Sequence, residues 1–133
     1  MCIFCDIIDH KIPASIVYED DKVLAILDIS QITYGHTIVM PKKHTANLLE
    51  ADEETVQACM HAVQMLAKQI LKNTGAAGCN IICNTGAAAG QSVDHLHFHI
   101  IPRYGADDEI IIKGTGRSKK QDLDEVLKKV TGK

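Results

Sequence analysis

The chain has 133 residues, of which 46% are hydrophobic and 23% are charged, and its formal net charge is −3. This length predicts one domain with a substantial core, and the composition is that of a globular chain rather than a disordered one. The negative charge argues against broad, unspecific nucleic-acid binding, and no apolar run approaches the roughly 20 residues of a membrane span.

The chain begins with a C-x-x-C pair formed by Cys2 and Cys5. Such a pair is typical of half a metal site, of a redox dithiol or of two buried thiols, and the spacing alone leaves all three open. The chain contains five cysteines, and an odd number speaks against a disulfide framework. The first residues lack the basic start and apolar stretch of a signal peptide, so we expect a reducing, cytoplasmic location.

Three short apolar segments follow, with polar residues between them. Residues 16–18 and 23–28 predict two strands, and the polar run 19–22 predicts the turn that joins them into a hairpin. Residues 37–40 predict a third strand, which ends at Pro41.

One long helix is expected over residues 53–73, because apolar side chains recur there every three or four positions. Residues 80–84 predict a fourth strand. The loop 85–90 consists mainly of glycine and alanine, and it leads into a fifth strand. This fourth-to-fifth connection predicts a second hairpin.

Beyond the fifth strand the patterns are weaker. The apolar run 110–112 favours a short extra strand. Four apolar residues at helical spacing, Leu123, Val126, Leu127 and Val130, predict a short amphipathic helix. Together the elements predict an α+β fold, in which one long helix covers one face of an antiparallel sheet.

Histidine and large apolar residues alternate from residue 95 to residue 101. This period-two pattern predicts a strand with His95, His97 and His99 on one face and the apolar residues between them on the other. A strand rises about 3.3 Å per residue, so His95 and His99 are roughly 13 Å apart and cannot bind one metal ion together with His97. The three imidazoles must therefore have different tasks, and some should be neutral near pH 7.

These motifs resemble the histidine triad (HIT) family, in its Hint-type branch and its microbial, zinc-containing form. The resemblance covers nearly all of residues 1–103 and implies one HIT domain over residues 1–133, with a tail from residue 104. It implies a five-stranded antiparallel sheet with one long and one short helix, and a homodimer with a continuous ten-stranded sheet. The stretches that carry it are residues 12–14, 19–21, 28–29, 35–36, 41–44, 84–86, 90–93 and 95–101.

The resemblance also implies a reaction. His97 would attack the α-phosphorus of a nucleoside phosphoramidate or a related nucleotide and form a nucleotidyl-histidine, which water then opens. Neutral imidazole suits this role, because it is a good nucleophile at pH 7. His99 would hydrogen-bond the phosphate or the leaving group, and Ser92 would hold phosphoryl oxygens as charge shifts.

Further residues match positions that bind an AMP-type purine nucleotide. A carboxylate such as Asp28 can accept two ribose hydroxyls, and Asn84 would contact the phosphate or the ribose. For the apolar positions, ordinary core packing remains an alternative. The expected substrate-binding set is Ile3, Phe4, Ile12, Ile26, Leu27, Asp28, Ile29, Asn84, Gly90, Gln91, Ser92, Val93 and His99.

The resemblance also implies two further metal ligands for the C-x-x-C pair. Cys2, Cys5, His44 and His95 match a set of two thiolates and two imidazoles that suits tetrahedral Zn²⁺. Four protein ligands leave no open position, so we expect a structural zinc ion, and the chemistry itself needs no cofactor. The alternative is a reduced, metal-free pair with His44 in an ordinary hydrogen bond.

Two other functional classes remain open. The chain could be a nucleotide-binding regulatory or scaffold protein with incidental hydrolysis, or a plain zinc module for protein contacts. Within the enzyme hypothesis, dinucleoside polyphosphates are a rival substrate class. We expect neither nucleic acid nor a membrane as a partner.

Overall fold

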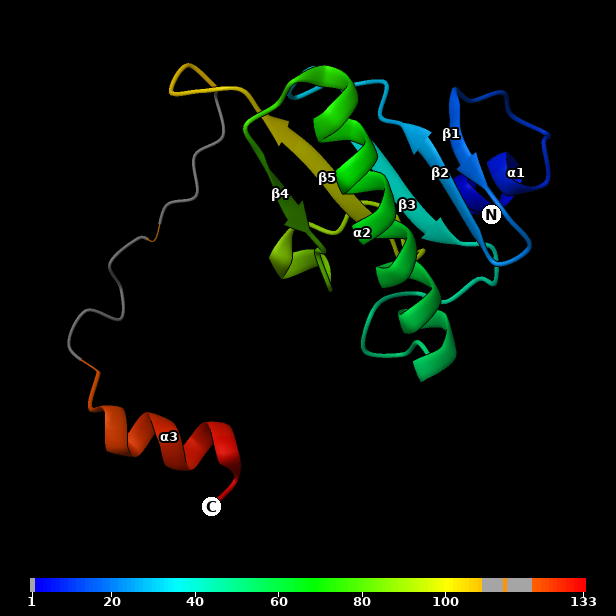
Figure 1. Ribbon diagram of the computed structural model, residues 1–133. Coiled ribbons are helices and arrows are strands. Elements are labelled where there is room, and N and C mark those ends of the chain that lie inside the picture. The colour runs from blue at the N-terminus through cyan, green and yellow to red at the C-terminus, as the bar shows by residue number, and fades with distance from the viewer. Residues whose placement is uncertain (1, 109–113, 115–120) are drawn as a thin grey trace.

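The computed structural model describes residues 2–108, 114 and 121–133. Its centre is an antiparallel sheet of five strands in the order β1-β2-β3-β5-β4, which confirms the predicted fold class (Figure 1). The strands are β1 (Ile16–Glu19), β2 (Val23–Leu27), β3 (Thr37–Pro41), β4 (Gly78–Ile82) and β5 (Phe98–Arg103).

Two helices cover opposite faces of this sheet. Helix α2 (Glu53–Thr74) lies across one face (Figure 1), where Leu66 packs with apolar side chains that include Phe98. The shorter α1 (Ile3–Ile8) places Phe4 on the other face, against side chains of β2 and β3. Because both faces are covered, β2 has buried residues at four successive positions instead of an alternating pattern.

The long helix has a capping residue at each end. The Asp52 side chain accepts a hydrogen bond from the backbone N–H of Thr55, as an N-cap does. Gly75 ends the helix with a φ of 76°, a left-handed conformation that glycine adopts without a steric penalty. The predicted helix over residues 53–73 is therefore confirmed, with one more residue at its end.

The strand predicted at residue 95 begins later, at Phe98. The last β3–β5 pair is Val39 with Phe98, and the same register would bring Leu96 opposite Pro41 two positions further on. Proline has no backbone N–H to donate, so the ladder stops and the N–H of Leu96 bonds to the carbonyl of Thr45 at 2.8 Å. The alternation of faces nevertheless continues, because Leu96 and Phe98 lie in the core under α2.

Other boundaries also differ from the sequence prediction. The fourth strand is Gly78–Ile82 rather than residues 80–84, because its partner begins only at Phe98. Helix α1 and a short 3-10 helix, Ala87–Ala89, were not predicted. The predicted last helix is confirmed as α3 (Leu123–Thr131). The possible strand at residues 110–112 lies outside the described residues.

Within the described residues, no helix combines the length and the apolar character that crossing a bilayer requires.

Candidate active site and metal centre

Four predicted metal ligands converge beside the start of β5. One donor atom each from Cys2, Cys5, His44 and His95 lies within 4.8 Å of all the others. Nδ1 of His95 is 3.4 Å from Sγ of Cys2 and 3.6 Å from Sγ of Cys5, and Nδ1 of His44 is 3.1 Å from Nδ1 of His95. Tetrahedral zinc, with bonds of about 2.3 Å to sulfur and 2.0–2.1 Å to nitrogen, separates its ligand atoms by roughly 3.3–3.8 Å. The four donors therefore fit a zinc ion.

Helix α1 explains the C-x-x-C spacing. Cys2 is its N-cap, and Sγ of Cys2 accepts a hydrogen bond from the backbone N–H of Cys5 at 3.4 Å. Residues three positions apart lie on the same side of a helical turn, so both thiols face one point. Burial, followed by the neighbouring Cys2 thiol, raises the pKa of Cys5 to about 11. Two adjacent thiolates at this place therefore need a cation to stabilise them.

The buried His95 ring has a tautomer that suits metal binding. Its Nε2 lies 2.8 Å from the carbonyl oxygen of Pro41, and a carbonyl only accepts hydrogen bonds, so Nε2 carries the proton. The lone pair is then on Nδ1, which faces the two thiols and His44. Burial lowers the pKa of His95 and keeps the imidazole neutral, which is the form that binds metal.

His97 has the opposite tautomer. Its Nδ1 lies 2.7 Å from the carbonyl oxygen of His95, so Nδ1–H donates and the lone pair of the neutral ring is on Nε2. The ring also packs edge-on against Phe4, with 5.0 Å between the ring centroids. His97 belongs to neither group of potential metal ligands among the described residues. The predicted division of tasks within the histidine row is therefore visible in the hydrogen bonds.

A second cluster joins His99 to His36 and Asp28. Nε2 of His36 lies 2.9 Å from Nδ1 of His99 and 3.6 Å from a carboxylate oxygen of Asp28. Nδ1 of His36 accepts a long bond from the backbone N–H of Ile32 at 3.4 Å, so the proton of His36 is on Nε2. His36 then donates to His99, whose own proton is on Nε2. Burial lowers the pKa of His36, and burial together with the His97 and His36 charges lowers that of His99 to about 4.

The sequence analysis assigned no role to His36. The pairing of β2 with β3, which the sequence did not predict, pairs Leu27 with Thr37 and so brings Asp28 opposite His36. The backbone N–H of Asp28 donates to the carbonyl of His36 at 3.0 Å. Once this strand pairing is known, the sequence shows a histidine opposite a carboxylate, and this pair could have pointed to His36.

An open cleft of about 470 Å³ lies between the N-terminal segment and the ends of β2. Its walls include Asp28 and most of the apolar residues that we expected to hold a base. Phe4 is an exception, since it packs against the His95 and His97 rings. The residues of the expected set that line the cleft are Ile3, Ile12, Ile26, Leu27, Asp28 and Ile29.

The loop before β5 brings several more expected residues together. Gly90 has a φ of 91°, and a Cβ atom there would lie 3.7 Å from the Asn84 side chain. Asn84 and Gly90 are therefore neighbours. Ser92 and Val93 line a separate pocket of about 500 Å³ next to the metal ligands.

Gln91 has a structural role that the sequence did not reveal. Its amide nitrogen donates to the carbonyls of Ala46 and Val93 at 2.7 and 2.9 Å, and its side-chain oxygen accepts from the N–H of Gly86 at 2.8 Å. The side chain thus holds both ends of the loop. The backbone N–H of Gln91 also donates to the carbonyl of Gly86 at 3.2 Å, so the donor groups of this residue are already bonded within the protein.

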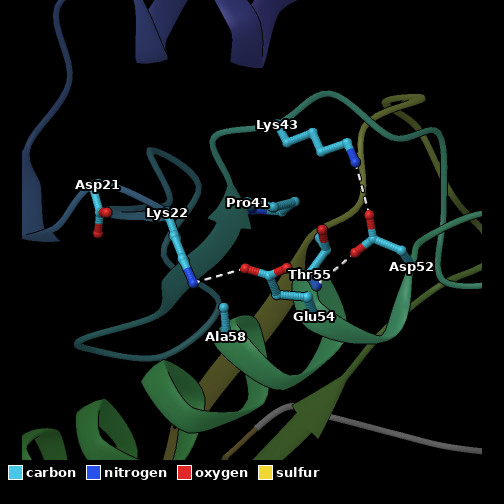
Figure 2. Close-up of a pocket in the computed structure, with 8 residues that line it drawn as sticks. All are labelled: Asp21, Lys22, Pro41, Lys43, Asp52, Glu54, Thr55 and Ala58. Carbon is cyan, nitrogen blue, oxygen red and sulfur yellow. Dashed lines mark hydrogen bonds and ion pairs between the residues drawn. The ribbon is translucent and has the colours of Figure 1, made fainter.

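Figure 2 shows a further pocket, which lies beside the N-terminus of α2. Two ion pairs span it, Lys22 with Glu54 at 2.9 Å and Lys43 with Asp52 at 2.7 Å. Pro41 also lines the pocket, and its carbonyl oxygen accepts the hydrogen bond from Nε2–H of His95.

His95 and His97 lie just before β5 and His99 lies within it, beside a group of two cysteines and two histidines. The HIT domain family matches residues 9–106. The chain therefore belongs to the HIT family.

Curated relatives support this assignment. An uncharacterised HIT-like protein of Methanocaldococcus jannaschii is 48% identical over 132 residues, which cover 99% of this chain and all of that protein. A protein of Arabidopsis thaliana named adenylylsulfatase HINT3 is 42% identical over 106 residues, which cover 80% of this chain and 54% of that protein.

Solved structures agree with the fold. A HIT family protein of Bacillus subtilis has a TM-score of 0.88 and 43% identity, with 99% of this chain and 96% of that chain covered. A zinc-bound histidine triad protein of Mycobacterium smegmatis has a TM-score of 0.79 and 39% identity, with 89% and 86% covered.

Proposed function

We propose that the protein is a nucleotide-binding hydrolase that cleaves nucleoside phosphoramidates through a nucleotidyl-histidine on His97. The observation that carries this proposal is the hydrogen bond from Nδ1–H of His97 to the carbonyl of His95, 2.7 Å long. This bond fixes the tautomer whose Nε2 can attack phosphorus. The attack forms the P–Nε2 bond and breaks the P–N bond of the substrate, and the leaving nitrogen takes one proton from solvent as it departs as the amine.

Water completes the reaction in a second step. Its oxygen bonds to the phosphorus, the P–Nε2 bond breaks, and the neutral imidazole of His97 is free again. One proton of the water is released to solvent, which balances the proton taken up by the amine. Nε2–H of His99 donates a hydrogen bond to a phosphoryl oxygen in both steps, because His36 occupies the other nitrogen of that ring. A donor that is already oriented stabilises developing charge without reorganisation.

The remaining expected residues bind the nucleoside and the phosphate. The cleft lined by Ile3, Ile12 and Ile26 takes the flat base between apolar walls, and Asp28 accepts the ribose hydroxyls. Asn84, the Ser92 side chain and the backbone N–H groups of Ser92 and Val93 hold the phosphoryl oxygens. The N–H groups of Gly90 and Gln91 already donate to the carbonyls of Ala87 and Gly86, and they shape the loop that carries these donors. A relative that is named an adenylylsulfatase supports chemistry at an adenylyl group.

Zinc has a structural task in this proposal. Cys2, Cys5, His44 and His95 would hold it, and four protein ligands leave no position for substrate. When bound, the ion stabilises the thiolates and ties α1 to the start of β5. The zinc-bound relative from Mycobacterium smegmatis supports this assignment.

The direct test is release of AMP from adenosine 5′-phosphoramidate. The wild-type protein should release AMP, and His97→Ala should be slower by at least about a thousandfold, as for loss of a nucleophile. His61→Ala is the matched control, because His61 is an exposed histidine of α2 outside both clusters. If the wild type binds AMP but releases none from phosphoramidates or diadenosine polyphosphates, the protein is a nucleotide-binding regulator instead.

We also propose a homodimer that joins two sheets at β4. This strand lies at an edge of the sheet, and its exposed Ile81 lines an apolar groove together with Met60 and Leu71 of α2. Exposed sheet edges next to apolar surface favour pairing with another chain. A mass equal to that of one chain in sedimentation equilibrium would contradict the dimer.

A further inference from the structure

We propose that the pocket beside Ser92 receives the leaving group of the substrate, and that Asp94 makes this pocket selective for a positively charged one. The inference rests on the hydrolase activity proposed above and names the preferred substrate class of the same site. That class is nucleoside phosphoramidates whose amine part carries an additional cationic group.

Two hollows share a wall at Ile3, and the next residue in the chain, Phe4, packs against the His97 ring. Ile3 lines both the nucleoside cleft and the pocket beside Ser92. A nucleotide whose base lies in the cleft and whose phosphorus faces His97 therefore directs its remaining substituent towards the second hollow. The pocket has a volume of about 500 Å³ and is lined by Cys2, Ile3, His44, Ser92, Val93 and Asp94.

Asp94 gives this pocket its charge. The residue is exposed, and no ion pair among the described residues involves it. The described lining residues include neither lysine nor arginine. The lysines that precede His44 in the chain are already paired, Lys42 with Glu19 and Lys43 with Asp52, each at 2.7 Å.

A zinc ion in the neighbouring group would not reverse this sign. The thiolates of Cys2 and Cys5 balance the two positive charges of zinc, and the histidine ligands are neutral. Among the described lining residues, Asp94 then carries the remaining formal charge. The pocket is negative with or without the metal.

The charge separates two substrate classes that share attack at the α-phosphorus. A cationic amine is attracted to the pocket, and an exposed ion pair of this kind changes affinity by about two- to fivefold. A polyphosphate chain carries several negative charges and is repelled. Asp94 therefore favours phosphoramidates over dinucleoside polyphosphates.

Amines of equal shape and different charge test the proposal. One adenosine phosphoramidate carries a terminal trimethylammonium group, a second carries a tert-butyl group of the same size, and a third carries a carboxylate. We expect the wild-type kcat/KM to be about two- to fivefold higher for the first than for the second, and lowest for the third. The preference should shrink as salt is added, because the screening length is about 10 Å at 0.1 M.

Variants assign the preference to one side chain. Asp94→Asn keeps the size and removes the charge, so the ratio of trimethylammonium to tert-butyl substrate should fall to about one, and Asp94→Lys should invert it. Asp107→Asn is the matched control, because Asp107 is an exposed carboxylate beyond the opposite end of β5. This control should keep the wild-type ratio.

The possible failures can be told apart. Equal kcat/KM values for all three amines in the wild-type protein, or a ratio that persists in Asp94→Asn, would overturn the assignment of the pocket. Faster hydrolysis of diadenosine tetraphosphate than of the cationic phosphoramidate would also overturn it. Absence of AMP release from all three amines would instead contradict the proposed hydrolase function.

Discussion

Two clusters of polar side chains flank His97, and they use the same residue type in different ways. Cys2, Cys5, His44 and His95 form one cluster, which we call the thiol cluster. Asp28, His36 and His99 form the other, which we call the carboxylate cluster. In each of them, one donor atom per residue lies within 4.8 Å of the others.

The clusters differ in which imidazole lone pairs and N–H groups their hydrogen bonds leave unoccupied. In the thiol cluster, the N–H of His95 is turned away to the carbonyl of Pro41, so the lone pair faces the other donors. In the carboxylate cluster, the N–H of His36 points inward at the lone pair of His99. One arrangement therefore directs ring lone pairs at the two thiols, and the other pairs its ring nitrogens internally and leaves Nε2–H of His99 as a donor. The hydrogen-bond partner of each ring, rather than the residue type, decides which nitrogen is left as donor or acceptor.

The largest expected effect comes from breaking the thiol cluster. Cys5→Ser should lower the zinc content from about one ion per chain to well below one. The free energy of unfolding should fall by at least about 3 kcal/mol, which is less than the 10–16 kcal/mol of isolated zinc fingers because the core under α2 remains. Zinc analysis of protein purified without chelators, together with urea unfolding, measures both quantities.

Cys79→Ser is the matched control, since Cys79 is a partly buried cysteine of β4 outside the cluster. It should retain zinc. A wild-type protein with well below one zinc ion per chain would contradict the metal assignment.

A change in the carboxylate cluster should affect activity and leave zinc in place. His36→Leu removes the donor that fixes the tautomer of His99, so kcat/KM for adenosine 5′-phosphoramidate should fall by about 10- to 100-fold. His36→Gln should restore part of the loss, because its amide N–H can donate to Nδ1 of His99. Equal activity of His36→Leu and the wild type would show that His99 does not depend on this bond.

The smallest effect concerns stability at acid pH. The pKa of His99 is lowered by burial from an ordinary value of 6.5 to about 4. Between these values the unfolded chain binds more protons than the folded one, so stability falls as the pH drops from about 6.5 towards 4. One such group contributes at most about 1.4 kcal/mol per pH unit.

Urea unfolding between pH 4.5 and 7 measures this slope. His99→Gln should have a shallower slope than the wild type, because it lacks one of the groups that bind protons on unfolding. Identical slopes for the two proteins would mean that His99 is not held neutral in the fold.

The sequence predicted the elements well, and the four residues that it named as metal ligands do converge in the structure, because these signals are local or carried by family motifs. The apolar stripe predicted α2 almost to the residue, and the alternation of residues 95–101 predicted which histidines share a face. The boundary at Phe98 depended on Pro41 of another strand, so it could not be found within the segment itself. Helix α1 was missed because its six residues are too few for a periodic pattern.

The hydrogen-bond partners of the histidines were also beyond the sequence. The carbonyl oxygens of Pro41 and His95 select the tautomers of two rings, and a backbone carbonyl has no signature in the residue type. The partnership of His36 with His99 joins residues 63 positions apart. Such contacts require the register of three strands, which a single sequence specifies only through the folded sheet.

The central proposal is that His97 is the histidine that forms the covalent bond to the nucleotide. Protein mixed with adenosine 5′-phosphoramidate and quenched within milliseconds should gain the mass of one adenylyl group, and peptide mapping should place that group on His97. His97→Ala should show no adduct, and His99→Gln should still form one. An adduct on His95 or His99, or AMP release at the wild-type rate by His97→Ala, would contradict the assignment.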